Sequence, residues 1–142
     1  MKLHEWLNSV IGTKVRDGQC VAFFRQFIQD VWGVPAFEGL GADGGAKDLF
    51  FRHAELRTQA KYSELITYEP GSIVRPMPGD AVIFKESPTN RWGHVAIFIS
   101  DTKDGMLVAE QDGIAVMAGR PAGAKFGLWS NDRLLGWLRK RS

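Results

Sequence analysis

The chain changes its hydrophobic period part-way along, and this change limits the folds it can adopt. In the N-terminal part, apolar residues recur three and four positions apart, as on one face of a helix. Beyond Pro70 they gather in short runs bounded by Pro, Gly and Asp, as in strands. These runs are too closely spaced for crossover helices, so the strands should pair antiparallel. We predict an α+β fold with N-terminal helices packed on an antiparallel β-sheet.

The first predicted helix starts at Leu3 and ends at Gly12. The second follows Asp17, its predicted N-cap, and continues until Gly33 and Pro35 stop it. A glycine-rich loop is expected over 38–45, followed by a short helix over 46–56. Strands are predicted over 80–84, 94–100, 106–111 and 134–139. With 142 residues, 44% of them hydrophobic, we expect one domain over 1–142.

Charge and composition argue against several kinds of function. A net charge of +2, without interleaved basic and aromatic residues, does not indicate nucleic-acid binding. No apolar run reaches membrane-spanning or signal-peptide length, so we expect cytoplasmic synthesis without a signal peptide and no membrane insertion. The single cysteine, Cys20, excludes an internal disulfide and zinc sites built on two thiolates.

Cys20 is the candidate nucleophile. It lies in the first turn of the second predicted helix, where unpaired backbone N–H groups and the positive end of the helix dipole stabilise a thiolate. Taken alone, a cysteine beside Phe23, Phe24 and Phe27 would be read as a small core residue.

His94 is the candidate base. It opens a predicted strand as a polar ring among apolar neighbours, and a buried polar group needs partners. His4 and His53 lie on predicted helices without a thiol or acidic partner at a suggestive spacing, and both are interpreted as surface residues.

The next predicted strand can supply an acid if the hairpin has the right parity, because side chains alternate between faces. A five-residue loop over 101–105 would pair Ser100 with Met106 and Ala96 with Glu110, which puts Glu110 on the face of His94. A three-residue loop over 103–105 keeps this parity, whereas a two-residue turn at 104–105 would send Glu110 to the opposite face. Glu110 is the first candidate for the acid that orients His94, and Asp112 is the second.

Four short motifs together resemble the CHAP domain, the cysteine- and histidine-dependent amidohydrolase/peptidase family with a papain-like fold. They are Asp17-Gly18-Gln19-Cys20-Val21, Pro78-Gly79-Asp80-Ala81-Val82-Ile83-Phe84, Gly93-His94-Val95-Ala96-Ile97 and Val108-Ala109-Glu110-Gln111-Asp112. The match covers nearly the whole chain.

The resemblance implies that Cys20 attacks an amide carbonyl, that His94 acts as base and then acid, and that Glu110 orients His94. It also implies an oxyanion hole formed by the backbone N–H of Cys20 and the side chain of Gln19. Relatives often carry Asn where this chain has Asp112. Some relatives bind calcium just before the cysteine, but the segment 12–17 has one carboxylate and two cations, so we predict no metal and no cofactor.

The implied substrate is bacterial peptidoglycan, cut at the sugar-to-peptide amide or within the peptides, as in phage endolysins, virion-associated lysins and autolysins. Trp92 is the candidate groove wall. We expect a monomer that acts on the wall after release by a holin-type partner.

Three alternatives stay open: an amidase of the glutathionylspermidine type, a catalytically silent phage structural or wall-binding module, and a cysteine-based redox protein. The joint presence of Cys20, His94 and Glu110 argues against the silent module. The lack of a second cysteine argues against the redox protein.

Overall fold

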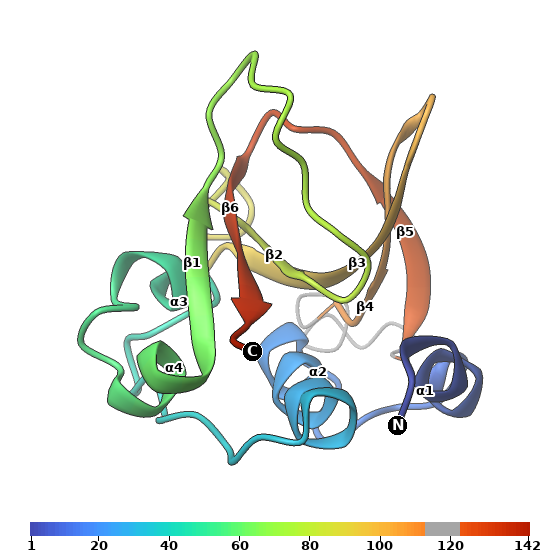
Figure 1. Cartoon of the computed structure of the whole chain (residues 1–142), viewed down its shortest axis with the longest axis vertical. Helices are drawn as coiled ribbons and strands as arrows, with labels where there is room; N and C mark the ends of the chain where they lie inside the picture. The colour runs from blue at the N-terminus through green and yellow to red at the C-terminus, as the bar shows by residue number, and fades with distance from the viewer. Residues whose placement is uncertain (113–122) are drawn as a thin grey trace.

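The fold is a six-stranded antiparallel sheet with helices packed against it (Figure 1). The computed structural model describes residues 1–112 and 123–142. In the sheet the strands follow the order β1-β6-β2-β3-β4-β5. Their bounds are Ser63–Thr67 (β1), Ala81–Phe84 (β2), His94–Thr102 (β3), Gly105–Glu110 (β4), Lys125–Trp129 (β5) and Leu134–Lys140 (β6). The predicted α+β class is confirmed.

The four predicted strands correspond to β2, β3, β4 and β6. The sequence analysis missed β1 and β5, which are the two edge strands of the sheet. Edge strands bury less apolar surface than central ones: Ser63 is the one buried residue of β1, and no residue of β5 is buried. Their hydrophobic signal is therefore weak.

The helices depart from the prediction in two places. Helices α1 (Leu3–Val10) and α2 (Cys20–Phe27) lie where expected, and the π-helical turn η1 (Ile28–Trp32) extends α2 as far as Gly33. Asp17 is not the N-cap of α2: Gln19 takes that position, and the Asp17 carboxylate accepts a hydrogen bond from the Gln19 N–H at 3.0 Å. The single helix expected over 46–56 is instead α3 (Asp48–Phe51), and α4 (Arg57–Tyr62) follows it.

Each face of the sheet has its own apolar core. On one face α1, α2 and η1 pack through buried aromatic side chains such as Trp6 and Phe27, and Val95, Ile97 and Ala109 of the sheet contribute to this core. On the other face the sheet curls around a second core built from Val82, Phe84, Ala96, Phe98, Met106, Val108, Leu134 and Trp137. In Figure 1, α2 lies beneath the middle of the sheet, and α3 and α4 lie beside β1 and β6.

The inner part of the β3–β4 hairpin has the predicted pairing, but its turn differs from both predicted loops. Thr102 pairs with Gly105 across a two-residue turn, so neither the five-residue nor the three-residue loop forms, and Ser100 pairs with Leu107 rather than Met106. The register then shifts between Phe98 and Ser100, and Phe98 pairs with Val108. A bulge adds one residue to one strand and so reverses the parity of every pair beyond it. His94 and Glu110 consequently lie on the same face.

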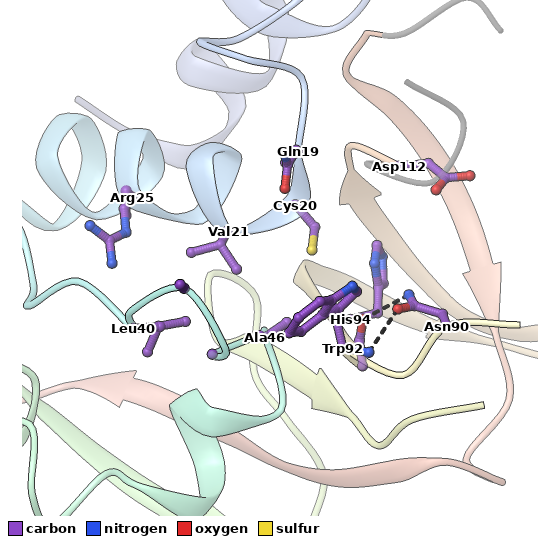
Figure 2. A pocket seen from close by; sticks show the side chains of 14 residues that line it. Gln19, Cys20, Val21, Arg25, Leu40, Ala46, Asn90, Trp92, His94 and Asp112 are labelled. Carbon is purple, nitrogen blue, oxygen red and sulfur yellow. Dashed lines mark hydrogen bonds between the residues drawn. The ribbon is translucent and has the colours of Figure 1, made fainter. Parts of the chain in front are cut away.

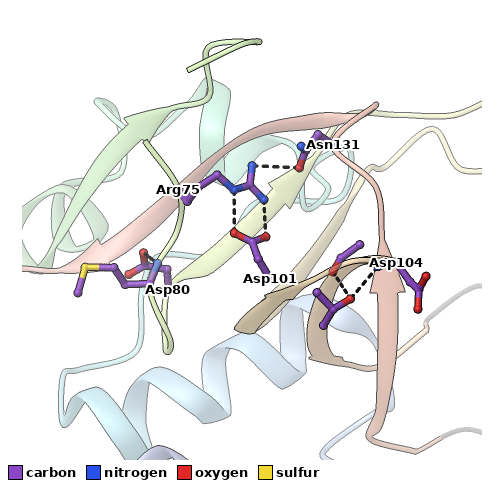
Figure 3. Close-up of polar contacts among 8 residues, drawn as sticks. Arg75, Asp80, Asp101, Asp104 and Asn131 are labelled. Atoms are coloured by element: carbon purple, nitrogen blue, oxygen red, sulfur yellow. Dashed lines mark hydrogen bonds and ion pairs between the residues drawn. The ribbon is translucent and has the colours of Figure 1, made fainter. Parts of the chain in front are cut away.

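An arginine ties the long β1–β2 connection to the far end of the sheet. Arg75 donates two hydrogen bonds to the carboxylate of Asp101 and a third to the side chain of Asn131 (Figure 3). None of the helices in the described part of the chain is long and apolar enough to cross a membrane.

A buried glutamine ties the segment before α2 to the end of β4. The Gln111 side chain accepts a hydrogen bond from the Val15 N–H at 2.6 Å and donates to the Val15 carbonyl at 3.0 Å and the Gln19 carbonyl at 3.2 Å. Gln111 is fully buried. Two segments that are far apart in the sequence are thereby held side by side.

We predict that Gln111→Leu lowers the free energy of unfolding by about 2–4 kcal/mol, because buried backbone groups lose their partners. Urea denaturation followed by circular dichroism measures this loss. The control is Gln29→Leu, whose side chain bonds only at the exposed surface, to Arg16; we expect a change within about 0.5 kcal/mol. Equal stability of the two variants would show that the Gln111 bonds contribute nothing.

Candidate functional site

Cys20 is the first residue of α2 and is partly exposed. The first N–H groups of a helix have no partner within it and point out of its N-terminal end. Gly18, two residues earlier, is buried with a φ of 87°, in the left-handed region that suits glycine. The turn at Gly18 and the Gln111 contacts together fix where the cysteine emerges.

His94 is the first residue of β3 and follows a tightly held turn. The Asn90 side chain accepts a hydrogen bond from the Trp92 N–H at 3.0 Å and donates to the Gly93 carbonyl at 2.8 Å. Gly93 has a φ of 76°, and a Cβ there would lie 2.5 Å from the carbonyl oxygen of Phe84. Only glycine fits this approach, which brings His94 to the end of the sheet nearest Cys20.

His94 and Glu110 form a buried hydrogen-bonded pair. His94 Nε2 lies 2.7 Å from Glu110 Oε1, and both side chains are more than nine-tenths buried. The same Oε1 accepts a hydrogen bond from the Trp129 indole N–H at 2.9 Å. The Cys20 thiol and the His94 imidazole line the same cavity, and the interaction with Cys20 is one cause of the raised pKa of His94.

These contacts set the charge state of the pair. Burial alone would lower the pKa of His94, but the hydrogen bonds and charges of Cys20 and Glu110 outweigh it and raise the pKa to about 9. Burial would raise the pKa of Glu110, yet the hydrogen bonds from His94 and Trp129 and the nearby positive charges lower it. At neutral pH the pair is an imidazolium and a carboxylate.

Trp129 also holds the imidazole by stacking. Its ring centroid lies 4.8 Å from that of His94 with an interplanar angle of 12°, and 4.4 Å from that of Phe84 with an angle of 26°. Gly127, two residues earlier on the same face of β5, leaves room for the carboxylate: a Cβ there would lie 1.8 Å from Glu110 Oε2. Trp129 therefore holds the Glu110 carboxylate by a hydrogen bond, and Gly127 leaves the space that this carboxylate occupies.

A cavity of about 380 Å³ opens beside the cysteine, and the Cys20 sulfur and the His94 ring both face it (Figure 2). Gln19, Trp92 and Asp112 line this cavity too, so five of the six predicted site residues lie around it, and the sixth, Glu110, is hydrogen-bonded to His94. The Trp92 indole is half-buried beneath the Arg91 guanidinium, 4.1 Å from its ring centroid. The other three tryptophans outside the site, Trp6, Trp32 and Trp137, are buried in the cores.

His53 was interpreted as a surface residue, but it is half-buried, and its Nε2 lies 3.1 Å from the Ser63 hydroxyl. It lies in the turn after α3, away from the site. His4 is exposed.

Four supporting residues were missed by the sequence analysis: Asn90, Gln111, Gly127 and Trp129. Gln111 was quoted only as part of a motif. The alternation Lys125, Gly127, Trp129 is the signal that would have found β5, since these residues share one face of an edge strand.

The arrangement has the parts needed for acyl transfer to sulfur: a thiol at a helix N-terminus, a histidine that lines the same cavity and an acid that hydrogen-bonds to the histidine. In residues 1–112 and 123–142, no group of three or more His, Cys, Asp or Glu side chains lies where it could hold a metal ion.

One comparison with known proteins identifies a family, and another finds solved structures with a similar fold. The family model of the CHAP domain matches residues 10–112. The crystal structure of the endolysin LysIME-EF1 resembles the fold with a TM-score of 0.66 at 19% identity, over 98% of this chain and 64% of that one. Ly7917 gives a TM-score of 0.64 at 18% identity, over 94% of this chain and 59% of that one. A Ly7917 structure with the hydrolyzing product of MDP gives 0.63 at 19% identity, over the same shares, 94% and 59%. No curated protein sequence matches the chain.

We predict that Gly127→Ala lowers activity by about tenfold or more while the protein stays folded. The added methyl group displaces the Glu110 carboxylate, and the φ of Gly127 is outside the left-handed region, so alanine introduces no backbone strain. Both the activity and the free energy of unfolding of the variant are measured, so that a loss of activity can be separated from a loss of stability. Gly39→Ala is the control, because a Cβ at Gly39 meets nothing within 4 Å. Full activity of Gly127→Ala would show that the position of Glu110 is not critical.

Proposed function

The chain belongs to the CHAP domain family, and from this premise we propose that it hydrolyses an amide bond of bacterial peptidoglycan, with Cys20 as nucleophile. The observation that carries the proposal is the position of His94, which lines the same cavity as Cys20 and hydrogen-bonds to Glu110. The solved structures that the chain resembles include an endolysin, and this supports the bacterial wall as the substrate.

In the first step Cys20, having given its proton to His94, attacks the carbonyl carbon of the scissile amide as a thiolate. Because Nε2 of His94 is bonded to Glu110, the other ring nitrogen is the one available to Cys20 and to the substrate. The negative charge that develops on the carbonyl oxygen is stabilised by the Cys20 N–H and by the Gln19 side chain, which lines the same cavity.

Collapse of this intermediate breaks the C–N bond. His94 gives its proton to the departing amine, and the acyl group stays on Cys20 as a thioester. His94, now neutral, takes a proton from a water molecule, which attacks the thioester and releases the carboxylic acid and the Cys20 thiolate. Glu110 holds the imidazole in place and stabilises its charged form in both steps.

The proposal covers two bonds, the N-acetylmuramoyl-L-alanine amide and an amide within the peptides. Residues 1–142 are proposed to act as one catalytic unit and as a monomer, on the wall, after release by a holin-type partner. Asp112 and Trp92 line the cavity and are proposed to contact substrate.

We predict that the wild-type protein clears a suspension of purified peptidoglycan and that Cys20→Ala and His94→Ala reduce the rate by about 10⁴-fold or more, to background. Glu110→Ala should retain part of the rate, because the acid acts through His94. Loss of turbidity measures the rate, and mass spectrometry of the fragments identifies the bond. Clearing by Cys20→Ala at the wild-type rate would overturn the mechanism. If no wall type is cleared, the alternatives are tested on a glutathione conjugate.

We predict that activity falls as pH rises through about 9, because His94 loses the proton that the leaving amine needs. Glu110→Gln removes a negative charge that raises the pKa of His94. The alkaline fall should then begin about one to three pH units lower.

The pH profile of kcat/KM measures this shift. Glu69→Gln, an exposed substitution in the β1–β2 connection, should leave the profile unchanged. If kcat/KM of Glu110→Gln falls at the same alkaline pH as in the wild type, Glu110 does not raise the pKa of His94.

A further inference from the structure

We infer that a second cavity on the far side of His94 binds a carboxylate carried by the leaving-amine part of the substrate. The inference rests on the proposed function and specifies the substrate class of the same site. This cavity measures about 340 Å³ and shares Asn90, Gly93, His94 and Asp112 with the cavity beside Cys20. The two cavities therefore form one groove that passes over His94.

Three cations from three separate segments line the second cavity. Lys85 follows β2, Lys125 begins β5 and Arg133 precedes β6. The Lys85 N–H donates to the Arg133 carbonyl at 2.9 Å, and Lys125 pairs with Glu110 across β4 and β5, so all three positions are fixed by the sheet. None of these side chains takes part in an ion pair within the part of the chain that the structure describes.

The acidic groups in this cavity do not balance the cations. Its carboxylates are Glu110, whose Oε1 is bonded to His94 and Trp129, and Asp112. Among the described residues that line the cavity, the three cations exceed the two carboxylates by one positive charge, and a protonated His94 adds to this excess. Such a cavity attracts an anion.

The geometry also says which part of the substrate reaches this cavity. Cys20 lines the first cavity and not the second, whereas Glu110 lines the second and not the first. The acyl group becomes bonded to Cys20, and the leaving amine takes its proton from His94. The chain beyond that amine therefore runs past His94 into the cationic cavity. An amino acid or peptide with a free carboxylate near its N-terminus is the leaving group that fits.

The first test measures binding without turnover, in the Cys20→Ala background. The probes are the dipeptide alanyl-glutamate, which has a free amine and two carboxylates, and alanyl-glutamine amide, which has the same shape and no carboxylate. In an NMR titration we expect alanyl-glutamate to bind about tenfold more tightly, with shifts at Lys85 and Arg133. The added pair of substitutions Lys85→Gln and Arg133→Gln should remove this preference.

The matched control replaces two exposed lysines away from the groove, Lys103→Gln and Lys140→Gln, and so makes the same change in net charge. This control variant should still bind alanyl-glutamate more tightly than alanyl-glutamine amide. Equal binding of the two dipeptides, or equal loss in the control and the cavity variant, would overturn the inference.

The second test compares the two pairs of substitutions in the active protein, on peptidoglycan. The cavity pair should raise KM by about tenfold with kcat little changed, and the control pair should not. Lys125 is left unchanged, because its charge also acts on Glu110. The two possible failures are distinguishable. If the wild-type protein cuts no peptidoglycan, the proposed function is wrong, whereas equal binding of the two dipeptides contradicts only this inference.

Discussion

The bulge between Phe98 and Ser100 is the constraint on which both cores and the site depend. The turn alone would set a pairing in which the inner half of β3 faces the wrong way. The extra residue reverses that half, so that Val95 and Ile97 meet the helices while Ala96 and Phe98 meet the curled face. Without the bulge His94 would point away from Glu110, and four apolar side chains would exchange cores.

The end of β4 connects the two halves of the site through consecutive residues. Glu110 points to the face that holds His94 and Trp129, and Gln111, the next residue, bonds to the segment before Cys20. Because neighbouring side chains in an extended chain point in opposite directions, one short segment fixes both the His94 imidazole and the segment that leads into Cys20.

The sequence was sufficient for the parts of the fold that carry strong periodicity. The face of α2 and the strands around His94 and Glu110 followed from alternation and spacing, whereas the shared face of these two residues was predicted from loops that do not form. The edge strands β1 and β5 did not, because an edge strand buries few side chains and its pattern is short. The two-residue turn at 103–104 and the bulge were not predicted. Whether two side chains share a face depends on the turn length and the bulge together, so a shared face does not determine either one separately. Asn90, Gly127 and Trp129 were missed because their importance comes from contacts across the sheet, which no local pattern shows.

The site is assembled from residues that are distant along the chain, and this has a consequence for biosynthesis. Cys20 emerges early, His94 and Glu110 much later, and the ring that stacks on the histidine belongs to β5, close to the C-terminus. Contacts of such sequence separation form only after the intervening chain is available. In a growing polypeptide the Cys20 thiol is therefore present before His94, Glu110 and Trp129 are, and the site is assembled only after β5 has been made.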